Sequence, residues 1–480
     1  MSNFSSLEIG KRALLAQKFG LDITSNNIAN VNTPGYSRRT AVLSEASSIK
    51  KDGNYMGTGV IVDKIQTFRV DYYDKEIRNS LSRLSSYQND TSFLQRVETI
   101  LSEPGETGLG ELVGQFFNTF NELTIKPESI ALRQSLLNQG ITMTDRFNQT
   151  AAGLNELRDE SKKNSENIVV GINDLLTEIS SLNIQILRSG KNSNGESQSL
   201  IDERSNRLED LSKLIDTRVG TNEDGSVNVF TNGINILTGS SPSKLKLIES
   251  IDNFSGEKTL KLTKYDDEKS TSIDIDAQSG EIFSNLKLYN ITLDDKDTSI
   301  SYSIALNFHN FVSKLAEKVN NLSAIGYGLN DNTGNPPGRV IFDGNGTELN
   351  AFTITINNNL VQNPADLPLS SKVSEPGNSS IARMIGNLSN DVNFLKGQTP
   401  TDFYSNLLGK IGSMSKETIN SLSSSQLIEQ QLNSQRESVM GVNLDEEAVN
   451  LIKFQKAFEA SSRIVATTNE ILATIVNLGR

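Results

Sequence analysis

Residue types that carry catalysis or bind metals are sparse in this sequence of 480 residues, which has one histidine and no cysteine. The histidine, His309, lies in the helical pattern LNFHNFVSK, and a lone histidine without cysteine ligands does not form a usual zinc site. Residues 343–348, DGNGTE, lack the spacing of an EF-hand calcium loop, so we interpret them as a turn. The sequence contains no phosphate-binding loop, GxSxG nucleophile elbow or paired-carboxylate motif. We therefore predict no enzyme activity, no cofactor and no metal site.

The segment TSNNIANVNTPGYSRR, residues 24–39, contains side chains whose chemistry is structural. Pro34 has no N–H and pushes Thr33 out of the right-handed helical region, while Gly35 can adopt the positive φ of a turn. The preceding helix is therefore expected to end near Asn32, and the asparagine amides can bond exposed backbone groups of this chain or of a neighbour. The predicted turn consists of Asn32, Thr33, Pro34, Gly35 and Tyr36.

The segment GVNLDEE, residues 441–447, has the features of a helix start. Gly441 breaks the preceding helix, and Asn443 has the side chain of an N-cap residue. Glu446, three residues later, completes a pair that resembles a capping box. Asp445 and Glu447 lie at the positive end of the helix dipole, where negative charge is favourable. We predict a well-capped helix after this segment.

Two stripes of large apolar residues recur every seven positions, one near each end of the sequence, which is the spacing of a coiled coil. The first stripe consists of Leu7, Leu14, Leu21 and Ile28, and the second of Leu444, Leu451, Phe458, Val465 and Leu472. The adjoining rows are Gly10, Gln17, Thr24 and Val31 in the first helix, and Ala457, Ile464, Ile471 and Leu478 in the second. We predict that the stripes form an assembly seam within and between subunits. The spacing equally allows two ordinary amphipathic helices that dock on one globular core.

Between the two ends the pattern changes from helical to β and back to helical. Helical spacing covers residues 127–189, 199–215, 304–322 and 400–439. After residue 217, short alternating runs predict strands, with Asp224-Gly225 as a hairpin turn between Val219 and Val227. We also interpret DAQSGEIF and FTITINNNLV as strand or hairpin pieces.

This order predicts a mainly α fold with a β-rich insertion, arranged as an elongated multi-domain protein. The terminal helices would pair as a coiled coil, a second domain would be helical, and a β domain would project outward. The predicted domains are residues 1–35 with 441–480 for the terminal coiled coil, 36–216 with 386–440 for the helical domain, and 217–385 for the β-rich outer domain.

Charge and hydropathy exclude two classes of partner. The formal net charge is −12, and the basic residues are scattered without a basic arm or an RNP-like aromatic cluster. This pattern argues against nucleic-acid binding. No stretch approaches the roughly 18 consecutive apolar residues of a membrane span, so no membrane association is expected. The N-terminal segment lacks a Sec signal, and export from the cell would require another route.

The segment ANVNTPGYSRR, directly after a heptad helix, closely resembles the signature of the bacterial flagellar axial proteins. Tyr36-Ser37-Arg38 and GVNLDEE are most similar to the FlgK family of hook-associated proteins, the hook-filament junction subunits. The internal segments SLIDERSNRLEDLSKLI, DGSVNVFTNGINILTG and TDFYSNLLGKIG resemble this family in matching order, whereas PGNSSIARMIGNL follows it only loosely. The resemblance spans nearly the whole chain, and the β insertion departs from the family in being compact.

The resemblance implies a structural subunit that leaves the cytoplasm through the flagellar type III pathway. It would assemble outside the cell as a ring layer that joins the hook to the filament. The implied partners are copies of itself, the flagellar hook protein, the second hook-associated junction protein and a cytosolic export chaperone. That chaperone would bind the C-terminal helix, because an amphipathic helix in a groove is a common recognition mode and the stripe from Leu451 to Leu478 fits it.

Two other functions are considered beside this one. A hook or distal rod subunit would share the terminal helices, but GVNLDEE and Tyr36-Ser37-Arg38 argue against it. A secreted adhesin or enzyme would carry its activity in the β domain and use the helices only for anchorage. Glycan binding or peptidoglycan hydrolysis by a fragment of residues 217–385 would support that second alternative.

Overall fold

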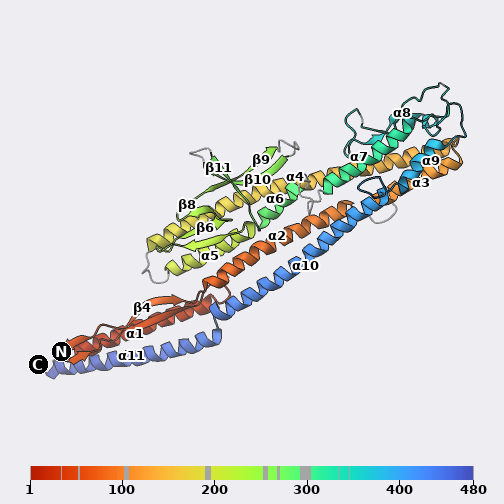
Figure 1. Ribbon diagram of the computed structural model, residues 1–480. Helices are drawn as coiled ribbons and strands as arrows, with labels where there is room; N and C mark the ends of the chain where they lie inside the picture. Colours follow the sequence, from red (N-terminus) through yellow and green to blue (C-terminus); the bar gives the residue numbers. More distant parts are fainter. Residues whose placement is uncertain are drawn as a thin grey trace.

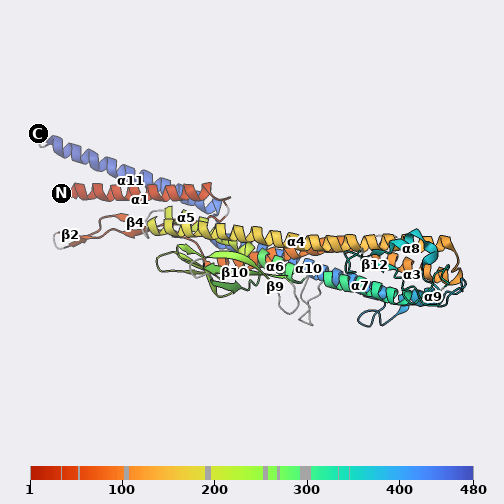
Figure 2. The ribbon, with the colours of Figure 1, turned by 90° about the horizontal axis from the view of Figure 1, so that it is seen from above.

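The protein is an elongated, mainly helical molecule whose two termini lie at the same end (Figures 1 and 2). The computed structural model describes residues 2–33, 35–51, 54–101, 108–189, 196–251, 258–266, 271–291, 304–332, 334–344 and 346–478. Long helices run along the molecule, and the strand-rich part lies beside them near the middle (Figure 1). The predicted fold class, mainly α with a β-rich insertion and paired terminal helices, is confirmed.

The terminal end is built from two antiparallel helices and one long hairpin. Helix α1 (Ser2–Ala29) lies beside α11 (Leu444–Leu478). The hairpin pairs β1 (Arg39–Glu45) with β4 (Val60–Thr67) and lies against α1, and its outer part is β2 (Ile49–Lys51) with β3 (Asn54–Met56). This hairpin was not predicted from the sequence, although Val60, Val62 and Ile65 give it an apolar pattern.

Two helices carry the chain from this end to the far end and back. Helix α2 (Asp71–Leu101) runs beside α10 (Pro400–Met440) over much of their length (Figure 1). Thr399 caps α10 by accepting a hydrogen bond from the Asp402 N–H, and Pro400 occupies the first turn. The other long helices are α3 (Leu109–Ile125), α4 (Ile130–Ser189) and α5 (Glu196–Leu214). The four helices predicted between residues 127 and 439 are confirmed with shifted ends, as α4, α5, α10 and α7 (Ile304–Ser323).

Seven strands between residues 218 and 275 form two antiparallel sheets that pack on α4, α5 and α6 (Glu281–Ile291). The first sheet has the order β5 (Arg218–Thr221), β6 (Val227–Thr231), β7 (Ile234–Thr238) and β8 (Ser241–Pro242). The second has the order β11 (Thr271–Ile275), β10 (Lys258–Asp266) and β9 (Lys244–Ile251). The predicted hairpin turn is confirmed, because Val219 pairs with Val229 and Gly225 has φ 87°.

The far end holds helix α7 (Ile304–Ser323) and a run of short elements. These are β12 (Phe342–Asp343), β13 (Thr355–Ile356), α8 (Asn358–Gln362), α9 (Ser380–Gly386) and the 3-10 turns Pro364–Asp366 and Asn387–Asn390. The strand interpretation of FTITINNNLV was mostly wrong, because Asn357 accepts a hydrogen bond from the Asn359 N–H and starts α8. DAQSGEIF also differs from prediction, since Gly280 turns with φ 93° and α6 follows.

Two hydrophobic cores hold the long part of the molecule together. The smaller core joins the second half of α4 to α5, α6 and the two sheets. The larger core joins α2, α3, the first half of α4, α7, α9 and the start of α10. Phe308, Phe311 and Phe342, within the predicted β-rich range 217–385, pack in this larger, mainly helical core. The predicted domain borders stay a prediction, and α4 belongs to both cores.

Candidate functional site: the paired termini

Small residues allow α1 and α11 to approach closely. A Cβ built on Gly10 would lie 2.8 Å from Cγ2 of Val465, and a Cβ on Gly20 would lie 2.6 Å from Cε1 of Phe454. Both glycines therefore receive the side chain of the facing helix. The fully buried face of α1 consists of Gly10, Ala16, Gly20, Thr24 and Asn27.

The predicted seam residues are not fully buried in the single subunit, and this includes Val465, which packs against Gly10. Those that are partly exposed are Leu7, Leu14, Leu21, Ile28, Leu451, Phe458, Val465 and Leu472. Leu444 is 51% exposed. Two residues of the predicted adjoining row are equally accessible, since Ile464 is 52% and Ile471 is 53% exposed. The buried residues of α11 are instead Glu447, Ser461 and Thr468. The helices thus bury small and polar groups and leave much of their large apolar surface accessible.

The close approach at Gly20 gives a testable prediction about this pair. Gly20→Ala is expected to weaken it by about 1 to 3 kcal/mol, because the Phe454 ring must move to admit the new methyl group. The measurement is amide hydrogen exchange, which should become faster throughout Ser2–Ala29 and Leu444–Leu478.

Gly409→Ala in α10 is the matched control for that substitution. Its added Cβ would meet no described heavy atom within 4 Å, and alanine is favoured over glycine in a helix by about 0.5 to 1 kcal/mol. This variant should leave exchange at the termini unchanged. Unchanged exchange in Gly20→Ala would contradict the prediction.

The turn after α1 is built by side-chain and backbone hydrogen bonds. Thr33 N–H donates to the Asn30 carbonyl at 2.9 Å, and Tyr36 N–H donates to the Thr33 carbonyl at 3.2 Å. Asn32 is exposed at the start of this turn, and Pro34 lies outside the described residues. Gly35 has φ 77°, and a Cβ there would lie 1.9 Å from Oδ1 of Asn206, so only glycine fits.

Asn27 is a fully buried amide that connects the turn, the hairpin and α11. Its Nδ2 donates to the Arg39 carbonyl at 2.8 Å and to Oε2 of Glu447 at 3.0 Å. Its Oδ1 accepts from the Arg39 N–H at 3.1 Å and from the Tyr36 hydroxyl at 2.8 Å. Burial of the hydroxyl raises the pKa of Tyr36 above its ordinary value. Asn27 of the sequence motif therefore bonds within the chain and links its two ends.

Glu447 and Glu446 join the start of α11 to the residues after the turn. Arg38 Nε lies 2.8 Å from Oε1 of Glu447, which is 2% exposed, and Arg38 Nη1 lies 2.7 Å from Oε2 of Glu446. Asn443 Oδ1 accepts from the Asp445 N–H at 3.0 Å, as an N-cap residue does. The Glu446 carboxylate thus has an arginine partner on the distant N-terminal segment, which the sequence pattern did not reveal.

A second cluster anchors the hairpin to the long helices. Arg39 Nη2 lies 2.7 Å from Oδ2 of Asp202 on α5, and Arg69 Nη1 lies 3.2 Å from Oδ1 of the same carboxylate. Arg69 Nε also lies 2.7 Å from Oδ2 of Asp74 on α2. Burial raises the pKa of the Asp202 carboxyl, and the hydrogen bond from Arg39 opposes that rise. The guanidinium of Arg39 also lies 4.9 Å from the ring centroid of Tyr36, which ties the turn to the same cluster.

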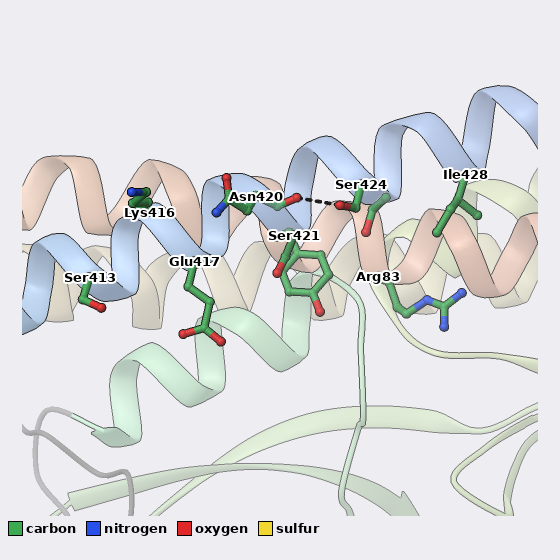
Figure 3. Close-up of a pocket in the computed structure, with 10 residues that line it drawn as sticks. Arg83, Ser413, Lys416, Glu417, Asn420, Ser421, Ser424 and Ile428 are labelled. Atoms are coloured by element: carbon green, nitrogen blue, oxygen red, sulfur yellow. Dashed lines mark hydrogen bonds between the residues drawn. The ribbon is translucent and has the colours of Figure 1, made fainter.

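The side chains that line the surface groove between α2 and α10 are not arranged as a catalytic set (Figure 3). The groove has a volume of about 560 Å³, and Arg83, Lys416, Glu417 and Ser424 are among the residues that line it. The Ser424 hydroxyl donates to the Asn420 carbonyl at 2.9 Å, so this serine bonds its own helix and not a base.

His309 lies at i−4 from Ser313 on α7, with 3.4 Å between its Nε2 and the serine hydroxyl. Burial lowers the pKa of His309 from its ordinary value.

Within the described residues, no three histidine, cysteine or acidic side chains cluster as metal ligands would. None of the described helices is long and apolar enough to cross a membrane.

Three parts of the chain match family models of flagellar proteins. The family model described as "Flagellar hook-associated protein FlgK helical domain" matches residues 94–337, just over half of the chain. Residues 7–36 match "Flagella basal body rod protein", and residues 434–478 match "Flagellar basal body rod FlgEFG protein C-terminal". The last two matches cover the paired termini and the turn.

Individual proteins are similar over nearly their full length. Flagellar hook-associated protein 1 of Bacillus subtilis is 27% identical over 512 residues, covering 99% of this chain and 98% of the relative. The protein of the same name from Salmonella typhimurium is 24% identical over 559 residues, covering 97% and 98%. The solved flagellar hook junction protein FlgK from Burkholderia pseudomallei has a TM-score of 0.62 at 11% identity, covering 76% of this chain and 100% of that one. At this low identity, the structural similarity shows the fold alone.

Proposed function

Because the chain belongs to the FlgK family of flagellar hook-associated proteins, we propose that it is the structural subunit that joins the flagellar hook to the filament. It is a flagellar axial protein, and its assembly with other axial proteins follows from the family. The relatives carry the name of a flagellar structural component. The ring layer, the export route and the individual partners are parts of our proposal.

One observation carries the assembly role: the terminal helices keep their large apolar residues partly exposed. The fully buried residues of the intramolecular contact are small or polar, although Phe454 and Val465 of α11 reach Gly20 and Gly10. The leucine stripe of α1 stays partly accessible along its length. Each large side chain that a neighbour covers contributes about 1.5 to 3 kcal/mol when its burial is complete. A ring of copies would therefore stabilise helices that a single subunit packs only loosely.

We propose four kinds of partner for these surfaces. Other copies would pack against the stripes, the hook protein would lie on one side of the layer, and the second hook-associated protein on the other. Before export by the flagellar type III route, a cytosolic chaperone would cover α11, whose exposed residues include Leu444, Ile452, Ile464 and Ile471. The strand-rich part would face outward from the assembled layer.

Electron microscopy of cells that lack this gene, combined with a search for flagellin in the medium, tests the proposal. Complete hooks without filaments, with flagellin shed into the medium, are the expected result. Absent or truncated hooks would move the assignment to a hook or rod subunit. Normal filaments would contradict a role in the flagellar axis and direct attention to the strand-rich part.

A further inference from the structure

A basic cavity of about 790 Å³ lies between α2, α5 and strands β5 and β6, and the paired helices α1 and α11 do not line it. Five basic and three acidic side chains line its wall. One of the basic residues, Arg69, is neutralised by Asp74 and Asp202. The acidic side chains are therefore too few to pair with all of the basic ones, and two of the remaining arginines are buried.

Arg78 of α2 is the first buried arginine of this cavity. Its side chain is 9% exposed, and burial lowers the pKa of its guanidinium from the ordinary value, an effect that the negative charges of Asp74, Glu209 and Asp71 oppose. Its Nε has no hydrogen-bond partner among the residues that the structure describes. A buried N–H without an acceptor is costly, because it has left water without a replacement partner.

Arg204 of α5 is the second buried arginine, with 6% exposure. Its Nη1 donates to Oδ1 of Asn183 at 2.8 Å and to the Gly225 carbonyl at 2.8 Å, and both acceptors are uncharged. Burial, with repulsion from Arg69, lowers the pKa of Arg204 to about 10, so it remains charged at neutral pH. Within the described chain, neither Arg78 nor Arg204 forms a direct ion pair with a carboxylate. Nearby carboxylates favour the charged form of Arg78, whereas no carboxylate of the described residues does so for Arg204.

We propose that this cavity binds an oxyanion, either phosphate or a carboxylate, between Arg78 and Arg204. The planar guanidinium matches the geometry of both anions and forms two parallel hydrogen bonds with either. The bound anion would accept a hydrogen bond from Nε of Arg78 and would supply the negative charge that Arg204 lacks. It would also connect α2, α5 and the first sheet, which meet at this cavity.

The test is isothermal titration calorimetry of the purified full-length subunit with inorganic phosphate, and separately with acetate, at constant ionic strength. We expect saturable binding of at least one of the two anions. Binding of phosphate identifies a free inorganic anion as sufficient, whereas binding of acetate alone assigns the site to a carboxylate, such as a side chain of a neighbouring subunit. Absence of saturable binding for both anions would overturn the proposal.

Variants assign the binding to this cavity. Arg78→Met should fold, because no hydrogen bond of Nε is lost and the flexible methionine side chain adapts to the space of the arginine stem. It should weaken anion affinity at least about tenfold. Arg78→Lys, which keeps the charge but not the fork, is a second variant with the same expected direction. Arg383→Met removes an exposed arginine of α9 as the matched control and should bind like the parent. Equal affinity in Arg78→Met and Arg383→Met would overturn the proposal.

Discussion

Replacing Phe458 and Val465 together by aspartate is expected to abolish filament retention. Both side chains lie on the stripe of α11, and Val465 packs against Gly10 of α1. The substitutions remove two large apolar groups, each contributing about 1.5 to 3 kcal/mol on burial, and add two charges that must lose water in the assembled layer. The measurement is electron microscopy of filaments on cells that express only the variant.

Gln455→Asp with Ala460→Asp is the control for that pair, since both residues are exposed on the same helix and the variant also gains two negative charges. It should retain more filaments than the stripe variant. Circular dichroism and gel filtration of both purified variants should show that the two hydrophobic cores are intact. Filaments at the wild-type level in the stripe variant would contradict the assembly role of these residues.

Asp202→Ala should cause the largest loss of stability of any single substitution considered for this protein. The carboxylate is 7% exposed and serves both Arg39 and Arg69, so its removal leaves two largely buried guanidinium groups with less compensation. Breaking a buried ion pair in this way costs about 3 to 5 kcal/mol. The free energy of unfolding in urea measures the loss.

Glu178→Ala provides the matched measurement at the surface. Glu178 pairs with Arg207 of α5 at 2.9 Å, but the two side chains are 51% and 40% exposed. Exposed pairs contribute below about 1 kcal/mol, so this variant should unfold close to the parent. A loss of stability for Asp202→Ala no greater than that for Glu178→Ala would show that the buried cluster does not hold the hairpin to α5.

The long helices could be predicted from the sequence because their apolar spacing extends over many turns. The β5–β6 hairpin could be predicted as well, since Asp224-Gly225 is a strong local turn signal. The same local reasoning failed at Asn357, where a capping side chain starts a short helix in an alternating sequence. The contact between α1 and α11 was also not predicted correctly. The prediction considered only large apolar residues, whereas the helices approach each other most closely at Gly10 and Gly20.

The network around Asn27 could not be predicted, because its partners are far apart in sequence. Asn27 and Glu447 are 420 positions apart, and Arg39 and Asp202 are 163 apart. The motifs around residues 24–39 and 441–447 were identified separately as a turn and a helix cap. Their contact depends on the antiparallel pairing of the terminal helices, which brings the two motifs to the same place.

Helix α4 has a mechanical consequence for the subunit. It is one helix of 60 residues, about 90 Å long at 1.5 Å per residue, and it belongs to both hydrophobic cores. The two cores cannot tilt against each other unless α4 bends. Compliance is therefore expected where α10 ends and α11 begins, at residues 441–443. Under torque, the subunit would bend at the end that holds α1 and α11, while the distance between its two cores stays constant.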